Sequence, residues 1–115
     1  MPRDLHKNLH FIGIGGTGMR PLAEIALARG YTVSGSDHSS SDTIQYLQAN
    51  GARIHIGHAS AALPEQEAVV IASTAIPADN AELVEAQRRG WSILHRSDLL
   101  KELMHDKKAI CVSGT

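Results

Sequence analysis

Three glycines near the amino end of the chain are spaced as Gly13-x-Gly15-x-x-Gly18, a pattern that can bind a phosphate group. Between a strand and a helix, the first glycine makes a tight turn, the second lets the backbone approach a pyrophosphate, and the third lets the helix pack on the strand. Backbone N–H groups and the positive end of the helix then attract the anion. The pattern has a second interpretation, because a tight turn can use glycines for conformational reasons only.

An acidic residue after the next predicted strand favours ligand binding. Asp37 follows a predicted strand at residues 31–36, about 20 residues beyond the glycines, where dinucleotide-binding folds place a carboxylate against a ribose. The alternative is a turn or capping aspartate beside the serines at 39–41. The glycines and the acid together are more specific than the glycines alone.

Other polar side chains have simpler explanations. His55 and His58 could be a metal pair, but no third ligand is spaced near them, so no metal site is predicted. Ser73 and Thr74 follow a predicted strand and could contact a ligand or only satisfy the backbone of a turn. No G-x-S-x-G elbow is present, and we predict no catalytic residue. Arg96 could reach an anion, although a solvated surface arginine is the simpler interpretation.

Composition restricts the class of protein. A chain of 115 residues is long enough for one core and short for two domains. Eleven basic and twelve acidic residues, without a block of like charge, argue against a nucleic-acid-binding surface. The lone Cys111 lies in an apolar run typical of a buried thiol. No leader and no apolar run near the roughly 18 residues of a membrane span are seen, so we expect a cytoplasmic protein that contacts neither nucleic acid nor membrane.

Alternating strand and helix patterns must position these residues. We predict strands at 9–12, 31–36, 52–56, 68–72, 91–94 and 109–112, with helices after the glycines and at about 42–50, 81–89 and 99–104. Because Pro21 has no N–H, the first helix should be capped at about Gly18. The fold class predicted is α/β: a Rossmann-like, mostly parallel sheet of five or six strands with helices on both faces. Ligands should bind outside the carboxyl ends of the strands.

The motifs at these strand ends resemble the amino-terminal domain of the Mur ligases. The matching segments are residues 11–19, 34–37, 56–58 and 73–77, in that order along the chain. Within the family they are most similar to the branch that joins L-alanine to UDP-N-acetylmuramate. The terminal Gly114 and Thr115 resemble the start of the family's ATP-binding loop.

The resemblance implies that residues 1–115 form a single Rossmann-like domain that binds the UDP part of UDP-N-acetylmuramate and ends where the ATP loop of the next domain begins. It implies no cofactor in this chain, but ATP and magnesium for a full-length enzyme that also takes L-alanine. The chain by itself would bind and not ligate. The residues implied to contact the UDP-sugar are Gly15, Gly16, Thr17, Gly18, Met19, Ser36, Asp37, His58, Ser73, Thr74, Ala75 and Ile76.

Three alternatives remain at the level of the sequence. One is an NAD-binding domain of an oxidoreductase or sensor, with Asp37 on the adenosine ribose. Another is a ligase that recycles a muropeptide onto UDP-N-acetylmuramate and shares this domain, and a third is a CoA- or nucleotide-sensing module. Thr17, Arg20 and Pro21 also depart from the small residues expected in the family. For the variant Gly15→Val, we expect lost ligand binding with little loss of folding.

Overall fold

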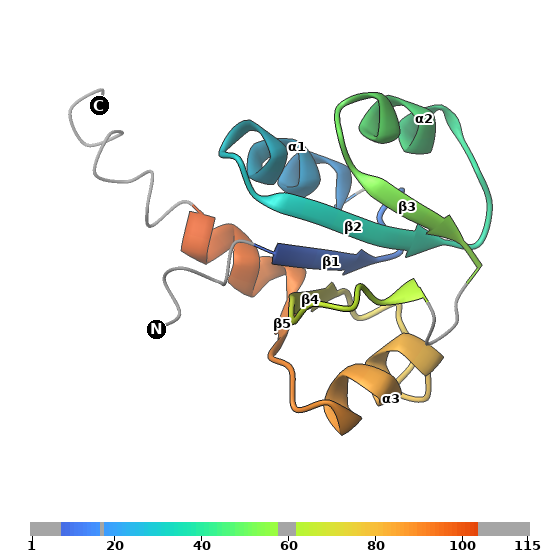
Figure 1. Ribbon diagram of the computed structural model, residues 1–115, viewed down its shortest axis with the longest axis vertical. Helices are drawn as coiled ribbons and strands as arrows, with labels where there is room; N and C mark the ends of the chain where they lie inside the picture. The colour runs from blue at the N-terminus through green and yellow to red at the C-terminus, as the bar shows by residue number, and fades with distance from the viewer. Residues whose placement is uncertain (1–7, 17, 58–61, 104–115) are drawn as a thin grey trace.

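Five parallel strands form one sheet in the order β3-β2-β1-β4-β5 in the computed structural model of the chain (Figure 1). The structure describes residues 8–16, 18–57 and 62–103, and the counts and absences reported below concern these residues. Residues 96–103 form a further helix directly after the last strand. The elements are β1 (Asn8–Ile12), α1 (Arg20–Ala28), β2 (Thr32–Asp37), α2 (Asp42–Ala49), β3 (Arg53–Ile56), β4 (Val69–Ala72), α3 (Ala81–Arg88) and β5 (Ile93–His95).

The central strand β1 determines where a ligand can bind. It pairs with β2 on one side, where Phe11 lies opposite Gly35, and with β4 on the other, where Phe11 lies opposite Ile71. The chain fills the β2 side first and then crosses to β4, so the strand order reverses at β1. In open parallel sheets, this reversal leaves a crevice at the carboxyl ends of the two strands. The glycine turn follows β1 at that crevice.

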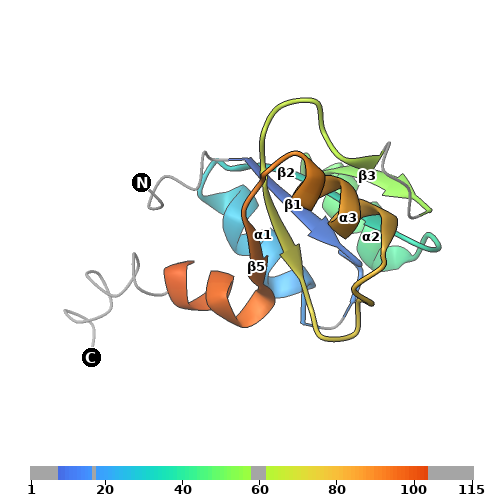
Figure 2. The ribbon, with the colours of Figure 1, turned by 90° about the horizontal axis from the view of Figure 1, so that it is seen from below.

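Helices cover both faces of the sheet, as predicted. Figures 1 and 2 show α1 and α2 on one face and α3 on the other. The face under α1, α2 and helix 96–103 is a continuous apolar cluster that includes Leu9, Phe11, Leu22, Ile44 and Leu99. The α3 face has a smaller apolar cluster, built from Ile12, Leu63, Val70, Ala72, Leu83 and Ala86. The strands are therefore buried on both sides near β1 and β4, which explains their continuous apolar runs.

The helices start where local chemistry permits. Met19 is the N-cap of α1 and its side chain makes no capping bond, while Pro21 occupies the first turn, where a missing N–H costs nothing. The late start predicted near Gly18 is therefore correct to one residue. In α2 the hydroxyl of Ser41 accepts from the N–H of Ile44, and in α3 the side chain of Asn80 accepts from the first turn.

The structure differs from the predictions at the later elements. Strand β5 begins at Ile93 rather than residue 91, and the helix that follows starts at residue 96 rather than 99. The predicted strand at 109–112, with Cys111, lies outside the described residues. Among the described residues, no helix is long and apolar enough to cross a membrane.

Candidate functional site

The glycine turn is held to the end of β2 by backbone hydrogen bonds. The N–H groups of Gly13 and Ile14 both donate to the carbonyl of Ser36, at 2.8 and 2.9 Å. Gly13 has a φ of +76°, a left-handed conformation that glycine adopts without strain, and its carbonyl accepts from the N–H of Gly16 at 2.9 Å. Several amides of the turn are thus already engaged within the protein.

The carboxylate of Asp37 closes the turn from the side. Its Oδ2 accepts from the N–H of Gly15 at 2.9 Å, and its Oδ1 accepts from the N–H of His38 at 2.8 Å. A Cβ on Gly15 would lie 2.8 Å from that Oδ2 and 3.1 Å from Cδ1 of Ile44. In Gly15→Val, the new side chain would therefore meet Asp37 and Ile44 before any ligand, and both side chains would have to shift.

A buried polar network lies beneath this turn, on the α3 face. Oε1 of Glu82 in α3 lies 2.7 Å from Nε2 of His10 in β1, and both side chains are fully buried. The hydroxyl of Ser36 lies 2.7 Å from each carboxylate oxygen of Glu82, and Nδ1 of His10 lies 2.9 Å from the hydroxyl of Ser34. The network joins α3, β1 and β2 at the end of the sheet that carries the glycine turn.

The loop after β4 meets the glycine turn across the reversal of strand order. The N–H of Ile76 donates to the carbonyl of Ser73 at 3.1 Å, and the N–H of Ala75 donates to the Ser73 hydroxyl at 3.3 Å. Cδ1 of Ile76 lies 3.5 Å from the position of a Cβ on Gly13. Thr74 and Ala75 are exposed. Two of the predicted ligand-contacting segments are therefore neighbours in space.

Two arginines flank the start of α1, and they differ in their partners. Arg20 donates to Glu24 at 2.8 Å and lies 4.8 Å from the ring centre of Tyr46; the hydrogen bond to Glu24 raises the pKa of Arg20 above its ordinary value. Arg96 reaches the turn from the first residue of helix 96–103. A Cβ on Gly18 would lie 2.8 Å from Cζ and Nη1 of Arg96, so the guanidinium lies directly against this glycine.

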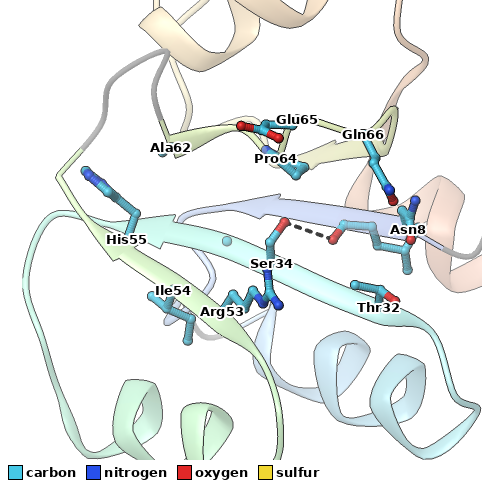
Figure 3. Close-up of a pocket in the computed structure, with 12 residues that line it drawn as sticks. Asn8, Thr32, Ser34, Arg53, Ile54, His55, Ala62, Pro64, Glu65 and Gln66 are labelled. Atoms are coloured by element: carbon cyan, nitrogen blue, oxygen red, sulfur yellow. Dashed lines mark hydrogen bonds between the residues drawn. The ribbon is translucent and has the colours of Figure 1, made fainter.

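A hollow of about 570 Å³ lies elsewhere on the α3 face (Figure 3). It exposes the first residues of three strands, Asn8, Thr32 and Arg53, and is bordered by the connection at residues 62–66. That described part of the connection forms no α-helix to cover β2 and β3. Of the predicted ligand-contacting residues that the structure describes, none lines the hollow. It opens toward the amino ends of the strands, away from the crevice.

The predicted site residues separate into three groups. Gly15, Gly16, Gly18, Asp37 and the segment 73–76 lie at the carboxyl ends of β1, β2 and β4. The side chains of Met19 and Ser36 are buried at 3% and 0% exposure, in the apolar cluster and in the Glu82 network respectively. The residues outside the described part of the chain are Thr17, His58, Gly114 and Thr115.

His10 and Glu82 are not among the site residues predicted from the sequence. One signal was present: a histidine in a strand predicted to be buried on both faces requires a polar partner. Its partner, Glu82, is 72 residues away along the chain, beyond the reach of local patterns. Within the described residues, no three His, Cys, Asp or Glu side chains gather in a way that could hold a metal ion.

The chain has relatives of known family along nearly its whole length. A family model described as "Mur ligase family, catalytic domain" matches residues 8–108. The UDP-N-acetylmuramate–L-alanine ligase of Pelotomaculum thermopropionicum is 49% identical over 111 residues, which are 96% of this chain and 24% of that protein. The chain thus spans about a quarter of the length of this curated relative.

Two solved structures share the fold. The UDP-N-acetylmuramate–alanine ligase of Thermotoga maritima matches with a TM-score of 0.82 and 29% identity, over 88% of this chain and 23% of that one. A murein peptide ligase from Psychrobacter arcticus matches with a TM-score of 0.75 and 29% identity, over 83% of this chain and 20% of that one. Both resemblances involve a minor part of a longer ligase.

Proposed function

The chain belongs to the Mur ligase family, and we propose that it is the amino-terminal substrate-binding domain of a ligase that joins L-alanine to UDP-N-acetylmuramate. The observation that carries this proposal is the 49% identity, across 96% of the chain, to a relative with that name. The geometry supports it, because the glycine turn and the loop after β4 meet at the crevice where strand order reverses.

Within this crevice, the diphosphate lies against the start of α1. The N–H of Gly18 donates to no described residue, and the positive end of α1 favours an anion there. Asp37 can still accept hydrogen bonds from a ligand, since each carboxylate oxygen can accept more than one. The nucleoside lies on the Asp37 side of the turn. The exposed part of loop 73–76 lines the other side.

The remaining chemistry belongs to other parts of a full-length protein. There, ATP with magnesium would supply the chemistry that activates the substrate carboxyl group, and L-alanine would be the second substrate. The present chain holds the UDP part, catalyses no step alone and works in the cytoplasm. The chain matches 24% of the length of this relative, and the rest of that length is sufficient for such additional domains.

A muropeptide-recycling ligase is the second candidate, favoured by the structural match to the murein peptide ligase of Psychrobacter arcticus at the same 29% identity. The TM-score is higher for the L-alanine ligase, 0.82 against 0.75. Both candidate ligases use the same UDP-sugar as a substrate, so they share the proposed binding site. Family membership weighs against the NAD-binding and CoA- or nucleotide-sensing alternatives.

Calorimetric titration of the chain with UDP-N-acetylmuramate, and separately with NAD, tests the proposal. We expect heat of binding for the UDP-sugar, competition by UDP and no competition by NAD. NMR shifts on adding the UDP-sugar should concentrate at Gly18, Asp37 and residues 73–76. Binding of NAD without a response to the UDP-sugar would overturn the proposal, and shifts confined to Arg53 and the hollow would overturn the location of the site.

A further inference from the structure

We propose that Arg96 is a ligand of the diphosphate, a side-chain cation that completes a site otherwise made of backbone groups. The inference rests on the proposed function, because it concerns the anion bound at the glycine turn. Its position follows from the fold: helix 96–103 begins without a loop at the end of β5, on the same edge of the sheet as the glycine turn.

The position of the guanidinium is the first argument. A Cβ on Gly18 would be 2.8 Å from Cζ, 2.8 Å from Nη1 and 2.9 Å from Nε of Arg96. The guanidinium therefore lies face-on against the backbone at the start of α1. Figure 2 shows the helix after β5 starting beside the start of α1. A phosphate oxygen near the Gly18 amide would be within reach of this side chain.

The absence of a competing partner is the second argument. Among residues 8–16, 18–57 and 62–103, the side chain of Arg96 has no hydrogen-bond or ion-pair partner, and the residue is exposed. Arg20, on the other side of the turn, is already paired with Glu24 and stacked on Tyr46. Of the two cations beside the start of α1, Arg96 is the one whose donors are available to a ligand.

The chemistry of the turn is the third argument. The amides of Gly13, Ile14, Gly15 and Gly16 donate to acceptors within the protein, which leaves few backbone donors for an anion. Nearby, Asp37 carries a negative charge that opposes a diphosphate. A guanidinium supplies up to two parallel hydrogen bonds to a phosphate and offsets that charge. The site therefore needs a cation, and Arg96 lies where one is required.

The test compares three ligands and two matched variants. UDP-N-acetylmuramate carries the diphosphate and a carboxylate, UDP carries only the diphosphate, and uridine carries neither. Arg96→Ala removes the proposed ligand, whereas Arg53→Ala removes an exposed arginine with the same charge from the edge of the hollow. Each variant is titrated by calorimetry after its thermal unfolding has been compared with that of the unmodified chain.

For Arg96→Ala we expect about a tenfold or larger loss of affinity for both UDP-N-acetylmuramate and UDP, the usual size for a charge-assisted hydrogen bond. Uridine binding, followed by NMR shifts, should not change, and the dependence of UDP affinity on salt should become shallower. Arg96→Lys should lose less, because the charge remains while the paired hydrogen bonds are lost. Arg53→Ala should change none of these quantities.

Gly18→Ala gives an independent check through the same contact. The new methyl group would displace the flexible end of Arg96, so the variant should also weaken UDP binding. In the Arg96→Ala background it should add little, because nothing remains to be displaced. Additive losses would instead indicate that the methyl group blocks the anion directly.

Three results would overturn the assignment of Arg96: unchanged UDP affinity in Arg96→Ala, an equal loss for uridine, or a loss for UDP-N-acetylmuramate without one for UDP, which would assign the arginine to the carboxylate. Additive losses in the Gly18→Ala cycle would leave that assignment intact and would indicate that the anion itself lies against Gly18. These outcomes are separate from failure of the proposed function, in which the unmodified chain itself would bind neither UDP-N-acetylmuramate nor UDP.

Discussion

The two faces of the sheet bury side chains of different chemical character. Under α1, α2 and helix 96–103, the buried side chains are apolar and form one continuous cluster. Under α3, the cluster is smaller and lies beside the fully buried network of His10, Ser36 and Glu82, and part of this face opens into the hollow over β2 and β3.

The apolar face stabilises the fold as a whole, whereas the polar network positions particular strand ends. The free energy gained by burying apolar side chains is roughly proportional to the buried area and has little directional preference. The first face therefore holds the layers together. Hydrogen bonds depend on distance and angle, so the network fixes how the ends of β1 and β2 lie relative to α3. Ser36 connects the two roles, since its hydroxyl contacts Glu82 and its carbonyl holds Gly13 and Ile14.

The largest expected effect is on the apolar face. Phe11→Ala removes a fully buried ring from the centre of the sheet and should lower the free energy of unfolding by about 3–5 kcal/mol. Urea unfolding followed by circular dichroism measures the change. Val84→Ala, at a position 49% exposed on α3, is the control and should change stability by less than about 0.5 kcal/mol. A loss below about 1 kcal/mol for Phe11→Ala would contradict the assignment of this face as the main core.

A smaller loss of stability with a local effect is expected on the other face. Glu82→Ala removes the acceptor shared by His10 and Ser36 and should cost about 2–3 kcal/mol, since buried polar groups lose a partner. Unlike Phe11→Ala, it should also speed hydrogen exchange of the Gly13 and Ile14 amides, because Ser36 holds both. Glu85→Ala, one turn later on α3, removes a carboxylate that pairs with Arg88 and Arg89 and has no hydrogen bond to β1 or β2, so it should leave that exchange unchanged. If the Gly13 and Ile14 amides exchanged at the same rate in Glu82→Ala and Glu85→Ala, the polar network would have no positioning role that distinguishes its face from the apolar one.

The smallest effect concerns the outer surface of α3. Hydrogen bonds from Arg88 and then Arg89 lower the pKa of Glu85 to about 2. A lowered carboxylate pKa stabilises the fold above the unfolded value near 4.5, and this contribution is lost as the pH falls toward 2. The difference in stability between the unmodified chain and Glu85→Gln should therefore be larger at about pH 6 than at about pH 3. It should be small throughout, as is usual for surface ion pairs, and an equal difference at both pH values would contradict the lowered pKa.

Most of the elements could be predicted from local patterns. The apolar run of β1, the glycines and the spacing of Leu22 and Ala26 predict a strand, a turn and an amphipathic helix within a short segment. The restriction at Pro21 also predicts the late start of α1. The N-cap of α2 is Ser41, whose hydroxyl accepts from the N–H of Ile44 at the third helical position. Residues 39–42 are all of types that cap helices, so the sequence alone does not decide which of them is the N-cap.

The sequence by itself determined the alternation of strands and helices, the glycine turn and the family, because each depends on neighbouring residues or on motifs in order. Only the tertiary structure decided that Glu82 contacts His10 and Ser36, that a side chain on Gly15 would strike Asp37, and that Arg96 lies against Gly18. These contacts join segments that are far apart along the chain. They exist because the sheet order places the ends of β1, β2, β4 and β5 at one edge, and sheet order is a property of the whole chain rather than of any local pattern.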